Sequence, residues 1–190
     1  MQFTPNIKER YAAGLREIIT RRILKGENTP KNKKLLKIIL VFSHLCRNEI
    51  KENINLLNSI ENLLKVVALK YNENQKSLTY DITGRKNYEI DYELLKLLVL
   101  ESVFNPTQIK VRINVKLLES RIIFTVQNAK PSKILKCLIK KGKGILINEK
   151  TGSNFAIMLP VKNVLHYENF KEKSEDYSDP FSALNIMLFQ

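Results

Sequence analysis

The segment best suited to chemistry in this sequence is Phe42-Ser-His-Leu-Cys-Arg-Asn-Glu-Ile50. A neutral imidazole nitrogen is a competent nucleophile near pH 7, so His44 could carry a phosphoryl group. At about 100° per residue, His44 lies about 200° from the apolar seam of the expected helix. We therefore expect His44 to face solvent, with Arg47 and Lys51 one to two turns along the helix to hold an acidic partner.

A second segment, from Asp91 to Asn105, predicts a helix that is apolar on several faces and that Pro106 closes. Glu101 and Asn105 are four residues apart, a spacing that places both side chains on one face of a helix.

These two segments resemble the H-box and the N-box of sensor histidine kinases. The family's H-box runs Phe-Ser-His-Glu-Leu-Arg-Asn-Pro-Leu, and the matching positions are Phe42, Ser43, His44, Arg47 and Asn48. The resemblance implies a phosphoacceptor role for the histidine. In the N-box it implies that Glu101 and Asn105 take the places of the family's Glu and Asn, of which the Asn side chain holds Mg²⁺ against the triphosphate. A hairpin, a glycine pair (Gly142 and Gly144) and a closing strand up to Pro160 follow in the family's order.

The departures from the family pattern fall on the residues that ATP chemistry needs. Leu45 stands where the family has the acidic residue that accepts a proton during autophosphorylation. Asn128 replaces the adenine-reading aspartate, and Lys130 and Ser132 replace glycines that let the backbone approach the nucleotide. We expect Glu101, Asn105 and Asn128 to be a vestigial nucleotide site, with no ATP turnover and no bound ATP or Mg²⁺.

The function that this resemblance implies is two-component signalling. The first hypothesis is a phosphotransfer or adaptor protein that relays phosphate through His44 to or from response-regulator receiver domains. A histidine phosphotransferase activity follows from that hypothesis, whereas ATP-dependent kinase activity does not. The alternatives are a non-catalytic, pseudokinase-like regulator that binds a protein partner, and a basic nucleic-acid-binding protein.

The first part of the chain predicts helices. Apolar residues three to four apart predict one helix over residues 7–25. From Lys33 to Tyr71 there is no Pro or Gly, and a continuous apolar seam fits one long helix, a helix pair joined near residues 53–58, or a coiled coil. Because a seam of this length lacks an obvious partner inside the chain, we expect a homodimer.

The second part of the chain predicts a small mixed sheet. Strict alternation over residues 109–127 predicts a hairpin, and further strands are expected at residues 77–83, 155–159 and 183–188. A short helix is expected near residues 131–141. The fold class is therefore α+β: a helical dimerising segment over residues 1–71, then an α/β sandwich over residues 72–190 that resembles the histidine-kinase ATPase domain.

Composition limits which other classes of protein the chain could belong to. The chain has 190 residues and a formal net charge of +13, which permits nucleic-acid binding, although the basic residues are spread out. No apolar run is long enough to span a membrane and the N-terminus lacks a signal-peptide pattern, so we expect a cytoplasmic protein. Cys46 and Cys137 match no metal-ligand spacing, and no metal is expected.

Overall fold

The computed structural model describes residues 7–73, 75–103, 109–148, 154–164, 170–174 and 182–188. It divides into two compact units. Unit 1 contains residues 1–49 and 177–190, and unit 2 contains residues 50–176. The boundary expected at residues 71 and 72 is therefore wrong, because the second half of the apolar seam belongs to unit 2.

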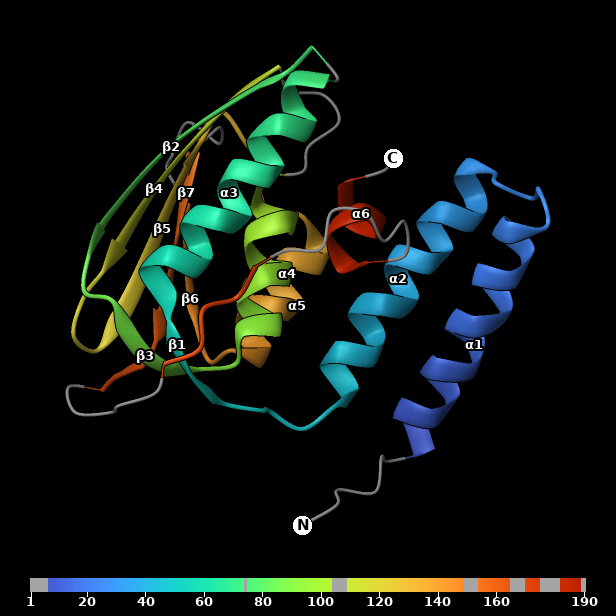
Figure 1. Cartoon of the computed structure of the whole chain (residues 1–190), viewed down its shortest axis with the longest axis horizontal. Coiled ribbons are helices and arrows are strands. Elements are labelled where there is room, and N and C mark those ends of the chain that lie inside the picture. The colour runs from blue at the N-terminus through green and yellow to red at the C-terminus, as the bar shows by residue number, and fades with distance from the viewer. Residues whose placement is uncertain are drawn as a thin grey trace. The chain divides into compact units, whose positions relative to one another are not determined.

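Unit 1 is built on a helical hairpin of α1 (Ile7–Leu24) and α2 (Pro30–Cys46) (Figure 1). The helix expected over residues 7–25 is confirmed. Thr29 begins α2: its hydroxyl accepts a hydrogen bond from the Asn32 N–H at 3.2 Å, and Pro30 occupies the first turn. None of the helices in the described residues is both long enough and apolar enough to cross a bilayer.

The end of the chain returns to this hairpin as a short helix, α6 (Ala183–Leu188). Ile186 packs in one buried cluster with Ile19, Leu36 and Ile39. The strand expected over residues 183–188 is therefore wrong. An alternation of only three apolar residues cannot separate a strand from one helical turn and a half, and packing against α1 and α2 decides the outcome.

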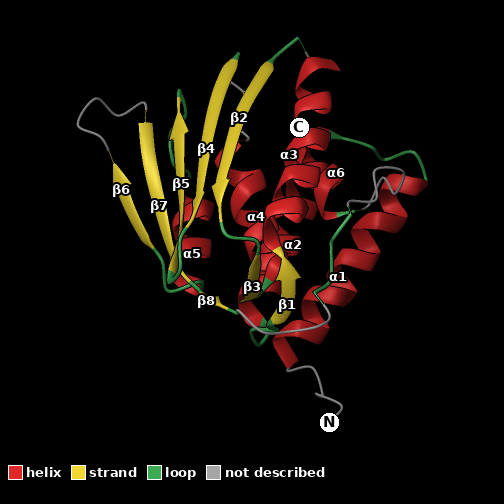
Figure 2. Ribbon diagram, turned by 60° about the vertical axis from the view of Figure 1, so that its left-hand side comes forward, coloured by secondary structure: helices red, strands yellow, loops and turns green. Residues whose placement is uncertain are grey.

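Unit 2 is built on a five-stranded sheet in the order β2-β4-β5-β7-β6. Figures 1 and 2 show α3 (Leu56–Glu73), α4 (Tyr92–Val103) and α5 (Lys133–Lys141) on one of its faces. The first strand pair is parallel and the others are antiparallel. The strands are β2 (Ser77–Gly84), β4 (Lys110–Leu117), β5 (Arg121–Gln127), β6 (Ile145–Asn148) and β7 (Asn154–Pro160). The expected hairpin, strands and buried helix in this region are confirmed.

Alternating burial along the central strands separates an inner from an outer face of the sheet. On β4, for example, Val111 and Ile113 are buried while Lys110 and Arg112 are exposed. Helix α3 buries Ile60, Leu63 and Val67 completely, among other apolar residues. Of the three alternatives for the seam over residues 33–71, the structure has the helix pair, α2 and α3, although residues 47–55 rather than 53–58 join them. The two helices belong to different units, and α3 is a core helix of unit 2.

A smaller sheet lies beside α3 and closes unit 2. It has the order β1-β3-β8, formed by β1 (Glu52–Asn55), β3 (Asn87–Ile90) and β8 (Lys162–Asn163). The segment 170–174 also attaches here: the Lys171 N–H donates to the Asn53 carbonyl at 3.0 Å, and the Asn55 N–H donates to the Lys171 carbonyl at 2.9 Å. We call residues 170–174 the return segment.

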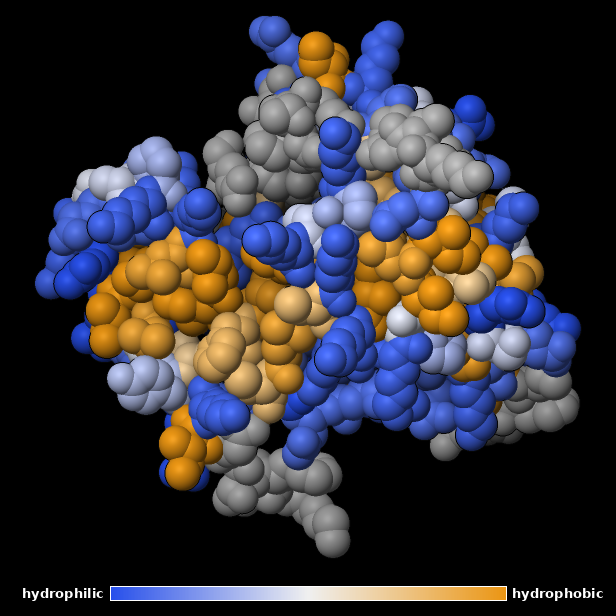
Figure 3. Space-filling model, turned by 180° about the vertical axis from the view of Figure 1, so that it is seen from behind, coloured by the Kyte–Doolittle hydropathy of each residue, from blue (hydrophilic) through white to orange (hydrophobic). Residues whose placement is uncertain are grey.

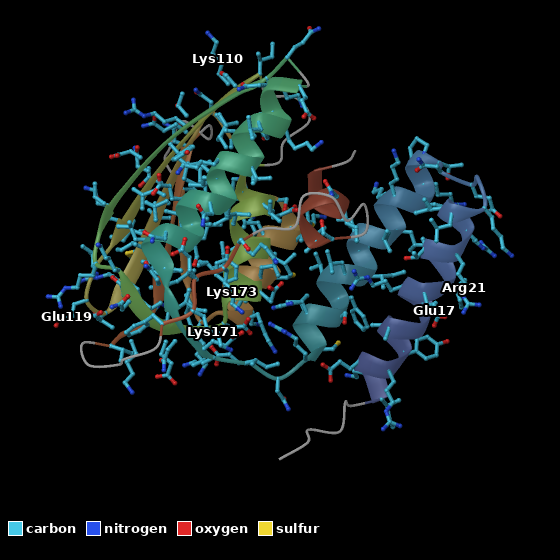
Figure 4. The ribbon with its side chains drawn as sticks, in the orientation of Figure 1. Glu17, Arg21, Lys110, Glu119, Lys171 and Lys173 are labelled. Atoms are coloured by element: carbon cyan, nitrogen blue, oxygen red, sulfur yellow. The ribbon has the colours of Figure 1, made fainter. Side chains whose placement is uncertain are left out.

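Two lysines of the return segment, Lys171 and Lys173 (labelled in Figure 4), form ion pairs with Glu52. The Lys173 ammonium lies 3.0 Å from one Glu52 carboxylate oxygen, and the Lys171 ammonium lies 3.1 Å from the same oxygen. The hydrogen bond from Lys173 is the main reason that the pKa of Glu52 lies below its ordinary value of 4.5, while partial burial acts in the opposite direction.

Candidate functional site

The structure places His44 in the last turn of α2, with 8% of its surface exposed. Phe42, which was expected on the buried seam, is 45% exposed. The expected solvent exposure of His44 is therefore wrong. Apolar residues occupy almost every position from Leu35 to Phe42, so their period does not identify which face of the helix is buried.

The H-box-like segment is divided by the end of α2. Arg47 has an extended backbone (φ −76°, ψ 158°) and its N–H closes the helix by donating to the Ser43 carbonyl. Beyond it, the Ile50 N–H donates to Asp91 Oδ2 at 3.3 Å. Lys51 is exposed and belongs to unit 2. The arrangement expected for Arg47 and Lys51, on one helix with His44, is therefore wrong.

The N-box-like helix, α4, directs its carboxylate inward. Glu101 is 5% exposed, and its Oε1 accepts a hydrogen bond of 2.6 Å from the Ser132 hydroxyl. The same hydroxyl accepts from the Leu135 N–H at 3.0 Å and thereby caps the N-terminus of α5. Asn105 lies outside the described residues. Glu101 thus meets a residue that replaces one of the family's nucleotide-binding glycines.

Asn128 stands at the turn that ends β5. Its backbone is left-handed (φ 61°), and its N–H donates to Asn154 Oδ1 at 3.1 Å. Asparagine tolerates this conformation better than most residues. The Asn128 side chain is exposed, and Ala129 beside it is completely buried. The structure therefore brings together Glu101 and Ser132, and it gives Asn128 a local role in the turn.

The glycine pair serves as the C-terminal stop of α5. The Gly142 N–H donates to the Leu138 carbonyl at 3.0 Å, and the Gly144 N–H donates to the Ile139 carbonyl at 2.9 Å. A β-carbon at Gly144 would lie 2.7 Å from Leu159 Cδ2 and 2.8 Å from the Met158 carbonyl oxygen. Close packing against β7 therefore requires this glycine, independently of any nucleotide.

Two residues that position these elements were missed as site residues. Asp91 is 4% exposed, and besides accepting from Ile50 it accepts from the Leu94 N–H at 3.1 Å, which caps α4. Ser132 caps α5 in the same way. Both precede apolar helical segments, and Asp and Ser are favoured at helix N-caps, so that preference was the available signal.

The described residues contain no group of three His, Cys, Asp or Glu side chains placed to hold a metal ion. Chemically, the geometry joins α4 to α5 through a carboxylate and a hydroxyl, where the family pattern expects a nucleotide between these two segments.

Comparisons with known proteins place the fold. No protein-family model and no curated protein matches the sequence. Among solved structures, the chain is similar to full-length ShkA in complex with AMPPNP, at 11% identity and a TM-score of 0.58, over 86% of this chain and 47% of that one.

Two further structures are similar at lower TM-scores. The Acinetobacter baumannii histidine kinase AdeS has 15% identity and a TM-score of 0.46, over 81% of this chain and 97% of that one. The cytoplasmic segment of histidine kinase QseC has 16% identity and a TM-score of 0.45, over 84% of this chain and 98% of that one. Identities this low indicate a likeness of fold alone. The α+β fold class expected from the sequence, helices followed by a sheet with helices on one face, is confirmed.

Proposed function

We propose that this chain is a two-component signalling adaptor that keeps the fold of a histidine-kinase core without turning over ATP. The observation that supports it is the hydrogen bond between Glu101 and Ser132. The N-box-like carboxylate and the residue in place of a nucleotide-binding glycine bind each other. The carboxylate would have to exchange this buried bond for a metal ion or a nucleotide, and a buried bond to a charged group stabilises by about 1.5–3 kcal/mol.

Calorimetry with ATP and Mg²⁺ tests the nucleotide part of the proposal. We expect no binding heat at micromolar protein. Micromolar affinity for ATP in the wild type, reduced by Glu101→Gln, would overturn the proposal and make the N-box resemblance functional.

Phosphate relay through His44 is the second candidate function, and the H-box resemblance favours it. A receiver domain must bring its aspartyl phosphate into line with an imidazole nitrogen, and His44 is 8% exposed. Relay therefore requires the last turn of α2 to open. An adaptor requires no such step.

Mixing the protein with phosphorylated receiver domains separates these two functions. The adaptor predicts no acid-labile phosphate on the wild type, and an unchanged interaction with its partner in His44→Ala. Acid-labile phosphate on the wild type that is absent from His44→Ala would establish relay instead.

We also propose that unit 1 pairs with a second copy of itself. Helix α1 carries an apolar stripe at helical spacing (Ile7 85%, Tyr11 70%, Leu15 39% and Ile18 52% exposed), and α2 carries Leu35, Ile38 and Phe42 at 39–45%. In Figure 3, which shows the molecule from behind, hydrophobic side chains gather at the left, over α1 and α2. Steps of three and four residues are those of helices that pack in bundles. Within unit 1, α6 packs on Ile19, Leu36 and Ile39 and leaves both stripes exposed.

Sedimentation equilibrium tests this pairing. Ile18→Asp places a charge on the stripe and should shift the protein to monomer, because the charge would be buried without a partner in the dimer. Ala13→Asp is the matched control, since Ala13 is exposed on the opposite side of the same helix. A wild type that is monomeric, or a control that dissociates equally, would contradict the proposal.

A further inference from the structure

The solvent face of α5 consists of lysines. Lys133, Lys136 and Lys140 are exposed and recur at helical spacing, so they lie within about 100° of one another around the helix, while Leu135, Leu138 and Ile139 are buried on the other side. Lys130 and Lys143 are exposed just before and just after the helix. We call these five residues the lysine face.

The N-terminal part of the lysine face does not stabilise its own helix, whereas Lys140 stands in the last turn, where positive charge is favoured. Lys133 and Lys136 stand in the N-terminal turns, where the helix dipole disfavours positive charge, and the first turn contains no acidic residue. Lys136 and Lys140 are like charges at a spacing of four residues, which destabilises a helix. In the part of the chain that the structure describes, none of the five lysines has a carboxylate partner. An external anion would relieve this repulsion.

The sequence around α5 is also without negative charge. From Arg121 to Asn148 it contains seven Lys and Arg residues and no Asp or Glu. Glu101, which bonds to the N-cap residue of this helix, is buried and accepts from the Ser132 hydroxyl. The outer face of the sheet, by contrast, mixes its basic residues with the exposed Asp81. The surface of α5 therefore carries positive charge without the acidic residue that accompanies it on the outer face of the sheet.

The kind of anion follows from the side chains that are present and absent. The apolar side of α5 is buried inside unit 2, so the helix has no hydrophobic face to insert into a bilayer. Protein interfaces favour aromatic residues, Met and Arg and are poor in Lys, whereas this face is entirely Lys apart from Cys137. Lysines that act as point charges are typical of contacts to a phosphodiester backbone.

We propose that the lysine face of α5 binds the phosphate backbone of a nucleic acid, independently of base sequence. From Lys133 to Lys140 the helix rises about 10 Å, a length over which one strand of B-form DNA presents about three phosphates. The three exposed lysines of α5 thus match the spacing of successive phosphates. This interaction is separate from the signalling role proposed above, and it uses none of the residues assigned there.

Fluorescence anisotropy with fluorescein-labelled duplex DNA, duplex RNA and single-stranded RNA of mixed sequence tests the proposal on the full chain. The test variant removes three charges from the lysine face, and the matched control removes three charges from the outer face of the sheet in the same unit. The test substitutions are Lys133→Gln, Lys136→Gln and Lys140→Gln, and the control substitutions are Lys110→Gln, Arg112→Gln and Lys116→Gln.

We expect wild type and control to bind with affinities that fall steeply between about 50 and 200 mM salt. The test variant should bind at least about tenfold more weakly, and on duplex DNA its slope of log affinity against log salt should be shallower by about 2.7, because each lost phosphate contact removes about 0.9. Bound nucleic acid should also slow alkylation of the exposed Cys137 in a Cys46→Ser background. The test variant should be at least as stable as the wild type, which excludes misfolding as the cause.

An equal loss of affinity in test and control variants would overturn the proposal, because net charge alone would then explain binding. Unchanged binding by the test variant, or no binding by the wild type, would overturn it as well. So would tighter binding to phosphatidylserine vesicles or to polyglutamate than to nucleic acid at equal anionic charge, since the face would then serve a membrane or an acidic protein.

Discussion

Replacing Ser132 with alanine removes both bonds that its hydroxyl makes. The loss of the N-cap bond from the Leu135 N–H costs about 1 kcal/mol. The loss of the bond to Glu101 costs about 1.5–3 kcal/mol, because the acceptor is a buried carboxylate that no longer receives this donor. We expect Ser132→Ala to lower the free energy of unfolding by about 2.5–4 kcal/mol.

Urea unfolding followed by circular dichroism measures this change, and a double-mutant cycle isolates its larger part. Glu101→Met removes the acceptor while keeping a similar volume, so Ser132→Ala in that background should cost only the cap, about 1 kcal/mol. Ser132→Thr keeps a hydroxyl and should retain most of the stability. A coupling energy between Ser132 and Glu101 within about 0.5 kcal/mol of zero would refute the reasoning, because the bond would then not join α4 to α5.

Three further outcomes follow from the structure. The hydrogen bond from Lys173 is the main reason that the pKa of Glu52 lies below 4.5. The ionised carboxylate therefore stabilises the folded protein fully above pH 4.5, and this contribution is lost as the pH falls through the pKa of the folded state. Glu52→Gln should make the free energy of unfolding less dependent on pH in this acidic range. Burial raises the pKa of Tyr88 from 10.0 to about 12, so stability should fall as the pH rises above 10. Ultraviolet titration of Tyr88→Phe should lack one tyrosine that ionises near pH 12 in the wild type. Gly144→Ala should lower the free energy of unfolding by about 1–3 kcal/mol, because its methyl group would overpack against β7. Gly14→Ala has nothing within 4 Å of the new methyl group and should stabilise α1 by about 0.4–1 kcal/mol. Thermal unfolding of both variants tests these two expectations.

The parts of the fold that the sequence predicted are those in which local pattern and burial agree. In the hairpin of β4 and β5, strict alternation over residues 109–127 matches a sheet with one buried face. Helix α4 was predictable because an apolar segment of its length, with a proline following, permits few other structures.

The errors arise where tertiary contacts decide between local alternatives. Strand β1 contains a single apolar residue, Ile54, and exists because it pairs with β3 and the return segment. Because the sequence did not indicate this strand, the apolar residues of α2 and α3 formed one continuous pattern. The boundary was therefore predicted between residues 71 and 72, whereas the structure divides the chain between residues 49 and 50.

The candidate site was predictable in its residue types and not in its contacts. The exposure of His44 depends on which face of α2 is covered. Because nearly every residue from Leu35 to Phe42 is apolar, the sequence does not indicate which face that is. The pairing of Glu101 with Ser132 joins residues 31 positions apart in different helices, so no local pattern contains it.

The return segment has a consequence for how the chain is connected. Unit 2 is an insertion between two parts of unit 1, and Lys171 hydrogen-bonds to the backbone of Asn53 and Asn55, so the entry and exit of the insertion are clamped together. These hydrogen bonds shorten the length of free chain that connects α2 to α6. The entropic cost of closing a loop grows with its length, so a shorter connection raises the local concentration of α6 near α2. Breaking the hydrogen bonds of Lys171 should therefore release Ile186 from its cluster before the rest of either unit unfolds.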